Sequence, residues 1–219
     1  MSPWSETNTS AGSVPGCSAC RFGPLPEYET SDPGDALDRH VRSFFAGHPI
    51  DRRTWPIGPM ESRIPGFFVY TVGPGPRFAG WTFVTAGCWR ATAEDGHGFE
   101  FTLSAPTPDD RHVEVLTMLV YYHSGGGPDR LDIGHMVALG DGPWLPGSSC
   151  DRLLVSLPYP YGPDLEHCSW ATGHAQILWA MPITASERAY ALAHGLEALE
   201  QKFDDAGVQF LDARRAPVV

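Results

Sequence analysis

The residues best suited to metal or redox chemistry are two cysteines near the N-terminus. Cys17 and Cys20 stand in the sequence CSAC, a C-x-x-C spacing that can bind zinc or form a redox pair. A tetrahedral zinc site needs four ligands, and the chain has no second C-x-x-C and no H-x₃₋₅-H to complete one. The pair also lacks the strand and helix that flank a thioredoxin-type motif. We therefore predict no metal site and no cofactor, and interpret the cysteines as reduced thiols.

The nine histidines provide a second set of candidate ligands. His123, His135 and His174 lie at the ends of predicted elements and could converge in space on a metal. None of the nine falls in an H-E-x-x-H motif, or in an H-x-E motif followed by P-C-x-x-C. A lone histidine at such a place is more often a hydrogen-bonded structural group, which is the interpretation that we favour.

Motifs for nucleophilic catalysis or phosphate binding are absent from the sequence. There is no G-x-S-x-G elbow, Walker loop or dinucleotide fingerprint. The glycine-rich stretches GPGPRF and GGGPD contain prolines, which remove main-chain donors that would hold a phosphate. Paired carboxylates stay possible, because Glu100, Glu114, Asp132 and Asp151 could meet in the fold. The missing motifs favour a binding protein over an enzyme.

Composition and charge restrict the class of partner. The chain has 219 residues, is 42% hydrophobic and has a net charge of −11. Such a surface repels phosphate backbones, so we expect no nucleic-acid binding, and it favours basic partners. The N-terminus does not resemble a signal peptide and no stretch approaches 18 apolar residues, so we predict a cytoplasmic protein that does not span or bind a membrane.

The elements that must position these side chains are those of an α+β fold, a central mixed sheet flanked by helices. We predict a flexible leader over residues 1–30 and a single domain over residues 31–219. Hydrophobic spacing and capping residues predict helices over 31–47, 107–123 and 184–207. Apolar and alternating runs predict strands over 67–72, 81–87, 97–106, 132–139, 152–157, 175–181 and 208–211.

Glu100 stands out within the strand predicted over 97–106. Phe99, Phe101 and Leu103 alternate with Glu100 and Thr102, which is the pattern of a half-buried strand. One interpretation is that Glu100 accepts buried hydrogen bonds, or pairs with a basic side chain, and so fixes the sheet. The other is that it lines a polar recess for a ligand or partner.

Four stretches in order carry a resemblance to a known family. They are WTFVTAGCW, GHGFEFTL, DIGHMVALGDGPWLPGSSCDRLLVSLPYPYGP and TGHAQILWAMPITASERAYALAHGLEALEQKFDDAGVQFLD. Together they resemble the suppressor-of-fused (Sufu) domain family in its bacterial form, from about Trp55 to Asp212. The resemblance implies an α+β domain that binds protein. The animal relative sequesters Gli-type transcription factors, whose peptide adds as a strand between its two halves; this chain resembles the amino-terminal half.

The resemblance sets the order of three functional hypotheses. Bacterial members are proposed as immunity proteins, so the first is a protein that neutralises a toxin by tight binding, and the acidic chain would suit a basic toxin. The second is an enzyme of specialised metabolism on the same scaffold, with Glu100, His135 and Asp151 as catalytic residues. The third is a regulator that sequesters a transcription factor. The residues that we predict to bind the partner are Phe99, Glu100, Phe101, His135, Trp144 and Asp151.

Overall fold

The computed structural model describes residues 32–56, 58–91, 97–127, 130–140 and 142–219. The leader predicted over residues 1–30, with Cys17 and Cys20, lies outside these ranges. The described strands are β1 (Ile50–Arg53), β2 (Phe68–Val72), β3 (Trp81–Ala86), β4 (His97–Ala105), β5 (Met136–Ala138), β6 (Arg152–Ser156), β7 (His167–Trp170) and β8 (Gly173–Ile183). The described helices are α1 (Pro33–Phe44), α2 (Met60–Arg63), η1 (Cys88–Ala91, a 3₁₀ turn), α3 (Asp110–His123), α4 (Pro163–Glu166), α5 (Ala185–His194) and α6 (Leu196–Ala206).

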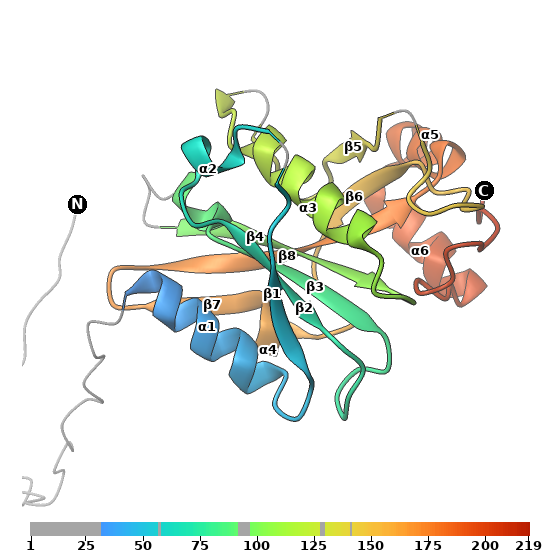
Figure 1. The fold of residues 1–219 in the computed structure, drawn as a ribbon. Helices are drawn as coiled ribbons and strands as arrows, with labels where there is room; N and C mark the ends of the chain where they lie inside the picture. The colour runs from blue at the N-terminus through green and yellow to red at the C-terminus, as the bar shows by residue number, and fades with distance from the viewer. Residues whose placement is uncertain (1–31, 57, 92–96, 128–129, 141) are drawn as a thin grey trace, which may run out of the picture.

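One mixed sheet organises the described part of the chain. Its order is β1-β2-β3-β4-β8-β6-β5, and β7 pairs with β8 beside this path (Figure 1). The first four strands follow one another as antiparallel neighbours. Strand β8 then pairs in parallel with β4, with Glu100 opposite Ile177, and antiparallel with β6 and β7. The expected α+β class with a mixed sheet is confirmed.

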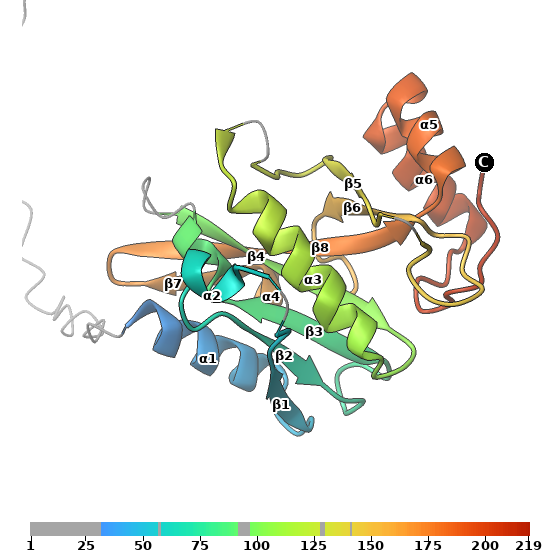
Figure 2. The same cartoon turned by 45° about the horizontal axis from the view of Figure 1, so that its top comes forward.

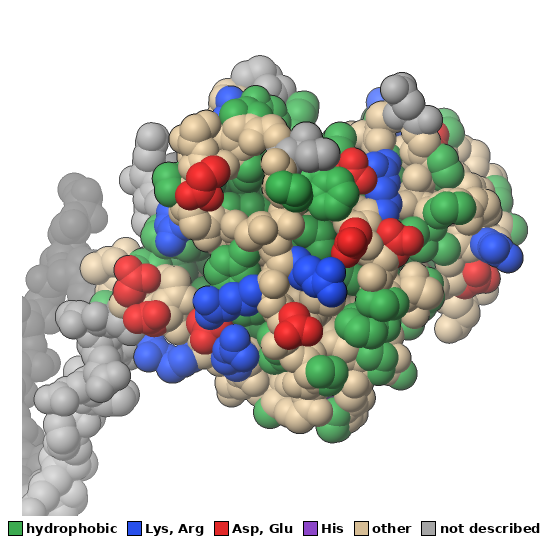
Figure 3. Space-filling view, in the orientation of Figure 1, with side chains coloured by type: hydrophobic (Ala, Val, Ile, Leu, Met, Phe, Trp, Pro, Cys, Tyr) green, Lys and Arg blue, Asp and Glu red, His purple; other side chains and the backbone are tan. Residues whose placement is uncertain are grey.

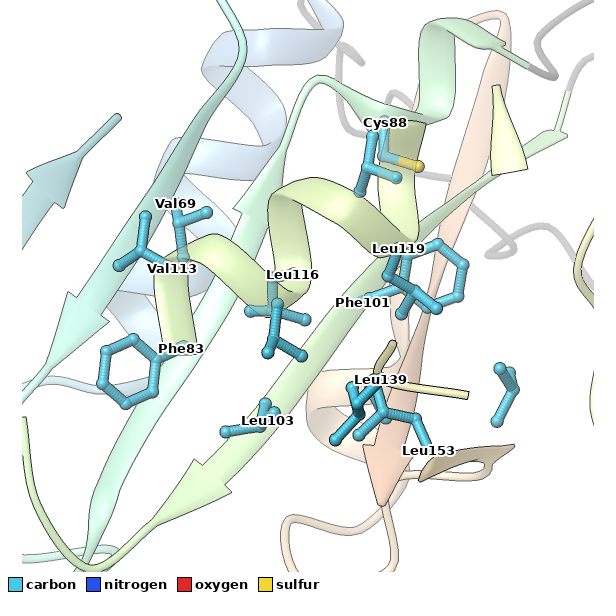
Figure 4. Close-up of a cluster of buried hydrophobic side chains, with 14 of the residues drawn as sticks. Val69, Phe83, Cys88, Phe101, Leu103, Val113, Leu116, Leu119, Leu139 and Leu153 are labelled. Carbon is cyan, nitrogen blue, oxygen red and sulfur yellow. The ribbon is translucent and has the colours of Figure 1, made fainter. Parts of the chain in front are cut away.

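Helices cover both faces of the sheet, as Figures 1 and 2 show. Helices α2 and α3 lie on one face, where a cluster of buried side chains joins α3 to β3, β4 and β6 (Figure 4). Helices α1 and α4 lie on the other face with β7 and form a second cluster. Helices α5 and α6 pack against the ends of β6 and β8 through a third cluster around Trp179 and Phe203. Strand β4 is therefore covered on both sides.

The predicted starts of α1 and α5 are confirmed, whereas α3 begins at Asp110, capped by Asp109, and not at residue 107. Asp32 caps α1 by accepting a hydrogen bond of 2.8 Å from the Gly34 N–H. Thr184 and Glu187 form the capping box of α5. The helix predicted over 184–207 is instead two helices, because Gly195, with φ of 95°, separates α5 from α6. Gly207 ends α6 in the left-handed conformation.

Two predictions about strands need correction. Residues 208–211 do not form a strand; Phe210 leaves the helix end and packs its ring against Trp179 and Phe203, at centroid distances of 4.9 and 5.7 Å. The strand predicted over 132–139 is limited to β5, because residues before it turn and the Asp132 carboxylate accepts the Ile133 N–H. Strands β1 and β7 were not predicted.

None of the described helices is long and apolar enough to cross a membrane.

Candidate functional site

Glu100 is completely buried and accepts hydrogen bonds from three donors. Its carboxylate accepts from the Thr85 hydroxyl at 2.5 Å, the Gly87 N–H at 2.8 Å and the Trp89 N–H at 3.3 Å. A buried carboxylate without such partners would cost several kcal/mol. The prediction that Glu100 accepts buried hydrogen bonds is confirmed.

These bonds lie where β3 and β4 separate. The paired register of the two strands ends at Val84 and Thr102. Beyond that point the Thr85 hydroxyl oxygen, rather than a main-chain carbonyl, accepts the Phe101 N–H at 2.8 Å. The chain then turns at Gly87, with φ of 110°, into η1. Glu100 thus replaces the main-chain pairing that the two strands lose and ties η1 to β4.

Gly98 serves the same junction by its lack of a side chain. A Cβ atom at Gly98 would lie 2.6 Å from the Trp89 Cα, Cβ and main-chain oxygen, which is well inside van der Waals contact. Only glycine lets η1 approach β4 this closely. The sequence GFEFT is therefore explained locally: Gly98 provides the space and Glu100 provides the acceptors that hold the turn of Cys88–Ala91.

The electrostatics of this junction favour a structural role. Burial raises the pKa of Glu100 to about 7, although the donors from Thr85, Gly87 and Trp89 act to lower it. Burial also raises the pKa of the Cys88 thiol, and raises that of Cys168 to about 12, with the Glu100 charge adding to both. These thiols are therefore protonated near neutral pH and poor nucleophiles.

The structure does not bring together the three residues that would be catalytic under the enzyme hypothesis, Glu100, His135 and Asp151. The main-chain oxygen of His135 accepts from Val155, whereas the Asp151 oxygen accepts from Leu139, so the two residues lie at opposite ends of the β5–β6 ladder. At about 3.3 Å per residue, this separates them by roughly 13 Å. Strands β8 and β6 lie between β5 and β4, which carries Glu100. His135 is exposed, and Asp151 forms an ion pair with Arg152 at 2.9 Å.

The predicted aromatic contact residues lie mainly inside the protein. Phe101 and Trp144 are 0% and 1% exposed, and Phe99 is partly buried. The rings of Phe99 and Phe101 contact His123, at centroid distances of 5.7 and 5.4 Å. The Trp144 indole N–H donates to His112 Nδ1 at 3.2 Å. Burial lowers the pKa of His112 and of His123 to about 4, so both rings are neutral core groups.

The histidines considered as joint metal ligands lie apart. His123 is buried and accepts the Leu131 N–H at 2.9 Å. His135 is exposed on the segment before β5. His174 lies at the start of β8, where its ring stacks on His97 at 5.9 Å. Within the described ranges, no three His, Cys, Asp or Glu side chains are placed to hold a metal ion.

A wide hollow in the described protein borders α3, and we call it the α3 groove. It has a volume of about 810 Å³ and lies between α2, α3 and β5. Its walls are mainly apolar and include Trp55, Pro59, Met60, Val115, Met118, Leu119, Tyr121, Tyr122, Val137, Ala138, Leu139 and Leu153, with Arg63 and Glu114 as charged members.

Several large apolar side chains of α3 reach the surface at this groove. Met118, Tyr121 and Tyr122 are 50%, 38% and 43% exposed. The Arg63 guanidinium lies 4.2 Å from the centre of the Tyr121 ring. Figure 3 shows hydrophobic side chains at the surface around α2 and α3. Sequence reasoning missed these residues, although the run LTMLVYY signalled them: it is apolar around the whole helix, more than one buried face requires.

The outer edge of β5 borders the α3 groove. In the β5–β6 ladder, the main-chain groups of His135 and Leu139 bond to β6, and by the alternation of an antiparallel pair so do those of Val137. Those of Met136 and Ala138 therefore point away from the sheet. Strand β5 is the last strand of the described sheet, so no described strand occupies this edge.

The opposite edge of the sheet, β1, is protected by charge. Arg52 and Arg53 are exposed there, and they form ion pairs with Asp38 at 2.7 Å and Asp110 at 3.1 Å. Figure 3 shows Lys and Arg side chains gathered over this strand. Charged side chains discourage the addition of another strand to an edge. Strand β5 consists of the uncharged residues Met136, Val137 and Ala138, so this edge has no charged side chain of its own to discourage the addition of a strand.

The fold and site define an α+β domain with one mixed sheet and an open sheet edge at β5. We call the hydrogen bonds of buried Glu100 with Thr85, Gly87 and Trp89 the Glu100 bracket. A family model described as suppressor of fused protein (SUFU) matches residues 65–216. The chain belongs to the suppressor of fused protein family. The residues of the Glu100 bracket and the GFEFT sequence lie within the matched range of residues 65–216.

Solved structures agree with this assignment. The chain is 34% identical to a crystal structure of a SUFU homologue from Neisseria gonorrhoeae FA 1090, with a TM-score of 0.73 over 86% of this chain and 97% of that one. A chain of the Sufu–Fu complex matches with 14% identity and a TM-score of 0.61, over 84% and 91%. Drosophila Suppressor of Fused matches with 16% identity and a TM-score of 0.59, over 85% of this chain and 51% of that one. No curated protein sequence matches the chain.

Proposed function

We propose that this protein binds an extended segment of a partner protein, which adds as a strand to the outer edge of β5. The observation that carries the proposal is that this uncharged edge borders the apolar α3 groove. In strand addition, main-chain hydrogen bonds supply affinity and pockets for alternate side chains supply specificity. The outward groups of Met136 and Ala138 provide the first, and the groove beside Tyr121 provides the second. The Sufu–Fu complex, a structure with the same fold, is consistent with binding of protein.

We further propose that the partner is a toxin that this protein neutralises, as an immunity protein does. Two features support this more specific function. Bacterial members of the family are proposed to have this role, and the chain resembles a bacterial homologue at 34% identity. The net charge of −11 would accelerate association with a basic toxin. Buried Glu100, Phe101 and Trp144 would then support the binding surface from within rather than contact the partner.

Capture of the partner with tagged protein and matched variants tests the binding mode. Ala138→Pro removes an outward N–H and leaves the bonds between β5 and β6, and proline is tolerated at such an edge. Tyr121→Ser removes an aromatic wall of the α3 groove. Tyr159→Ser, at a tyrosine that is 61% exposed and does not line the groove, is the control. We expect A138P and Y121S to lose the partner and Y159S to retain it.

The identity of the captured protein separates the possible roles. A partner that kills the host when expressed alone, and is harmless when co-expressed with wild type, supports immunity. A transcription factor as partner would replace immunity by regulation through sequestration, with the binding mode unchanged. Retention of the partner by folded A138P and Y121S would contradict strand addition at β5.

A further inference from the structure

A second hollow adjoins the free edge of β5 on the side of α5, and we call it the α5 pocket. It has a volume of about 300 Å³ and shares Tyr122 and Val137 with the α3 groove. Its lining residues are Tyr122, Leu131, Gly134, His135, Met136, Val137, Arg188 and Leu192. An edge strand that is bordered by two hollows can hold side chains of an added strand in both of them.

The two hollows adjoin the same edge and share Val137, but helices α3 and α5 beside them lie toward different faces of β5. Val137 and Leu139 pack with the cluster under α3, whereas Met136 packs with the cluster under α5 and α6. Successive side chains of a strand point to opposite faces. If one side chain of an added strand enters the α3 groove, its immediate neighbour therefore points toward α5, where Arg188 and Leu192 lie.

The charge at the α5 pocket is the opposite of the charge of the whole chain. Arg188 lines the pocket, and none of the residues that line it is an Asp or Glu. Within the described ranges, Arg188 has no carboxylate in ion-pair contact. Six arginines of the described ranges are paired with carboxylates, whereas Arg188, like the exposed Arg39, is not; the six are Arg42, Arg52, Arg53, Arg111, Arg152 and Arg215. A guanidinium beside an apolar pocket, with its donors unused by carboxylates, is suited to bind one from a partner.

Leu192 completes this recognition element. It lies four residues after Arg188 on α5, so the two side chains share a face of the helix. Leu192 is 66% exposed and lies outside the apolar cluster to which Leu199 and Phe203 of α6 belong. An exposed leucine beside an arginine can pack against the methylene stem of an acidic side chain.

We infer that the segment bound at β5 carries a large apolar residue directly next to an aspartate or glutamate. The apolar side chain occupies the α3 groove, and the neighbouring carboxylate pairs with Arg188 across the α5 pocket. This inference rests on the proposed strand addition and adds its specificity: local recognition is of an acidic side chain, even where the overall charge of −11 attracts a basic partner.

Selection from a phage library of random twelve-residue peptides, with the full chain as bait, tests the inference. We expect enriched peptides to contain an apolar residue adjacent to Asp or Glu. Arg188→Glu should select Lys or Arg at that position. Arg39→Glu, which makes the same change of charge on the exposed face of α1, is the matched control and should select the wild-type pattern. A synthetic selected peptide with its acid changed to the amide should bind wild type about tenfold more weakly, or about 1.4 kcal/mol.

The outcomes separate this inference from the proposed function. Enriched peptides that lose binding to A138P but lack the acidic position, or that are the same for R188E and wild type, would overturn the role of Arg188 and leave strand addition intact. Failure to enrich any peptide, or binding unaffected by A138P, would overturn strand addition and this inference with it.

Discussion

The Glu100 carboxylate and the Thr85 hydroxyl meet at 2.5 Å where β3 and β4 cease to pair through their main chains. The same hydroxyl accepts a hydrogen bond from the Phe101 N–H. One side chain from each strand therefore replaces the main-chain hydrogen bonds that are absent there. The GFEFT sequence is thus the point at which the central strand and the η1 turn are joined.

Replacement of Glu100 should destabilise the fold in proportion to the acceptors that are lost. Glu100→Ala leaves the buried Gly87 N–H and the Trp89 N–H without their acceptor, at a cost of roughly 2–4 kcal/mol. Glu100→Gln keeps one oxygen and can donate to Thr85, so we expect a loss of about 1 kcal/mol at neutral pH. Chemical denaturation of both variants measures the difference. Equal stability of E100A and wild type would contradict a stabilising role for the hydrogen bonds of Glu100.

The raised pKa of Glu100 makes the free energy of unfolding depend on pH in a specific way. Unfolded, the group ionises near 4.5; folded, burial raises the pKa to about 7. Between these values the folded state keeps a proton that the unfolded state has released, so this group makes the free energy of unfolding fall as pH rises. Glutamine cannot titrate. The stability of E100Q relative to wild type should therefore improve between pH 5 and pH 8, as measured by urea unfolding.

The two buried histidines act in the opposite direction. The pKa values of His112 and His123 are lowered to about 4 by burial, from 6.5. Between pH 6.5 and 4 the unfolded state binds protons that the folded state does not, so stability falls on acidification. Wild type partly compensates through Glu100, whereas E100Q does not, so E100Q should lose stability more steeply below pH 6.5. A parallel pH profile for both proteins would contradict the raised pKa of Glu100, and stability of E100Q that does not fall between pH 6.5 and 4 would contradict the lowered pKa of the histidines.

Gly98 should tolerate no side chain. In Gly98→Ala the new Cβ would lie 2.6 Å from the main chain of Trp89, which cannot move without breaking its bond to Glu100. We expect a loss of roughly 3 kcal/mol. Gly142→Ala is the control, because nothing lies within 4 Å of its Cβ position, and it should change stability by less than about 0.5 kcal/mol. Thermal unfolding of both variants decides the point.

Local sequence pattern predicted the long elements and missed what depends on partners distant in the chain. The alternation around Phe99 and Phe101 correctly predicted a strand. The polar residues between them, such as Glu100 and Thr102, are also buried, because α1 and β7 cover that face of the sheet. Strand β1, with the sequence IDRR, has no apolar pattern and forms through its ladder with β2. The groove was missed for the same reason: Met118 and Val137 become neighbours only through the fold.

The helix over 184–207 shows a second limit of local pattern. Leu192, Leu196, Leu199 and Phe203 have the spacing of one apolar stripe, yet the positive φ of Gly195 reorients the chain between them. Periodicity cannot show such a break, because glycine is also compatible with a continuous helix at a modest cost. Leu192, which lines the α5 pocket, lies before this break and is exposed, so it does not continue the buried stripe of Leu199 and Phe203.

The C-terminal segment is held by a buried ion pair whose loss should be severe. Arg215 donates to both oxygens of Glu187, at 2.5 and 2.8 Å, and the Val218 N–H donates to the same carboxylate at 3.2 Å. Burial alone would raise the pKa of Glu187, but Arg215 and the main-chain donors lower it below its usual value. The carboxylate is therefore charged inside the protein while it is paired with Arg215.

Removal of that partner should accordingly cost more than removal of a surface arginine. Arg215→Ala leaves the Glu187 charge buried and uncompensated, so we expect a loss of about 3–5 kcal/mol. Arg214→Ala changes the exposed neighbouring residue and should alter stability by less than about 0.5 kcal/mol. Because Glu187 also caps α5 through the Thr184 N–H, R215A should expose the amides of α5 to hydrogen exchange before those of β4. Uniform exchange in R215A, or stabilities equal to those of R214A, would mean that the pair does not anchor α5.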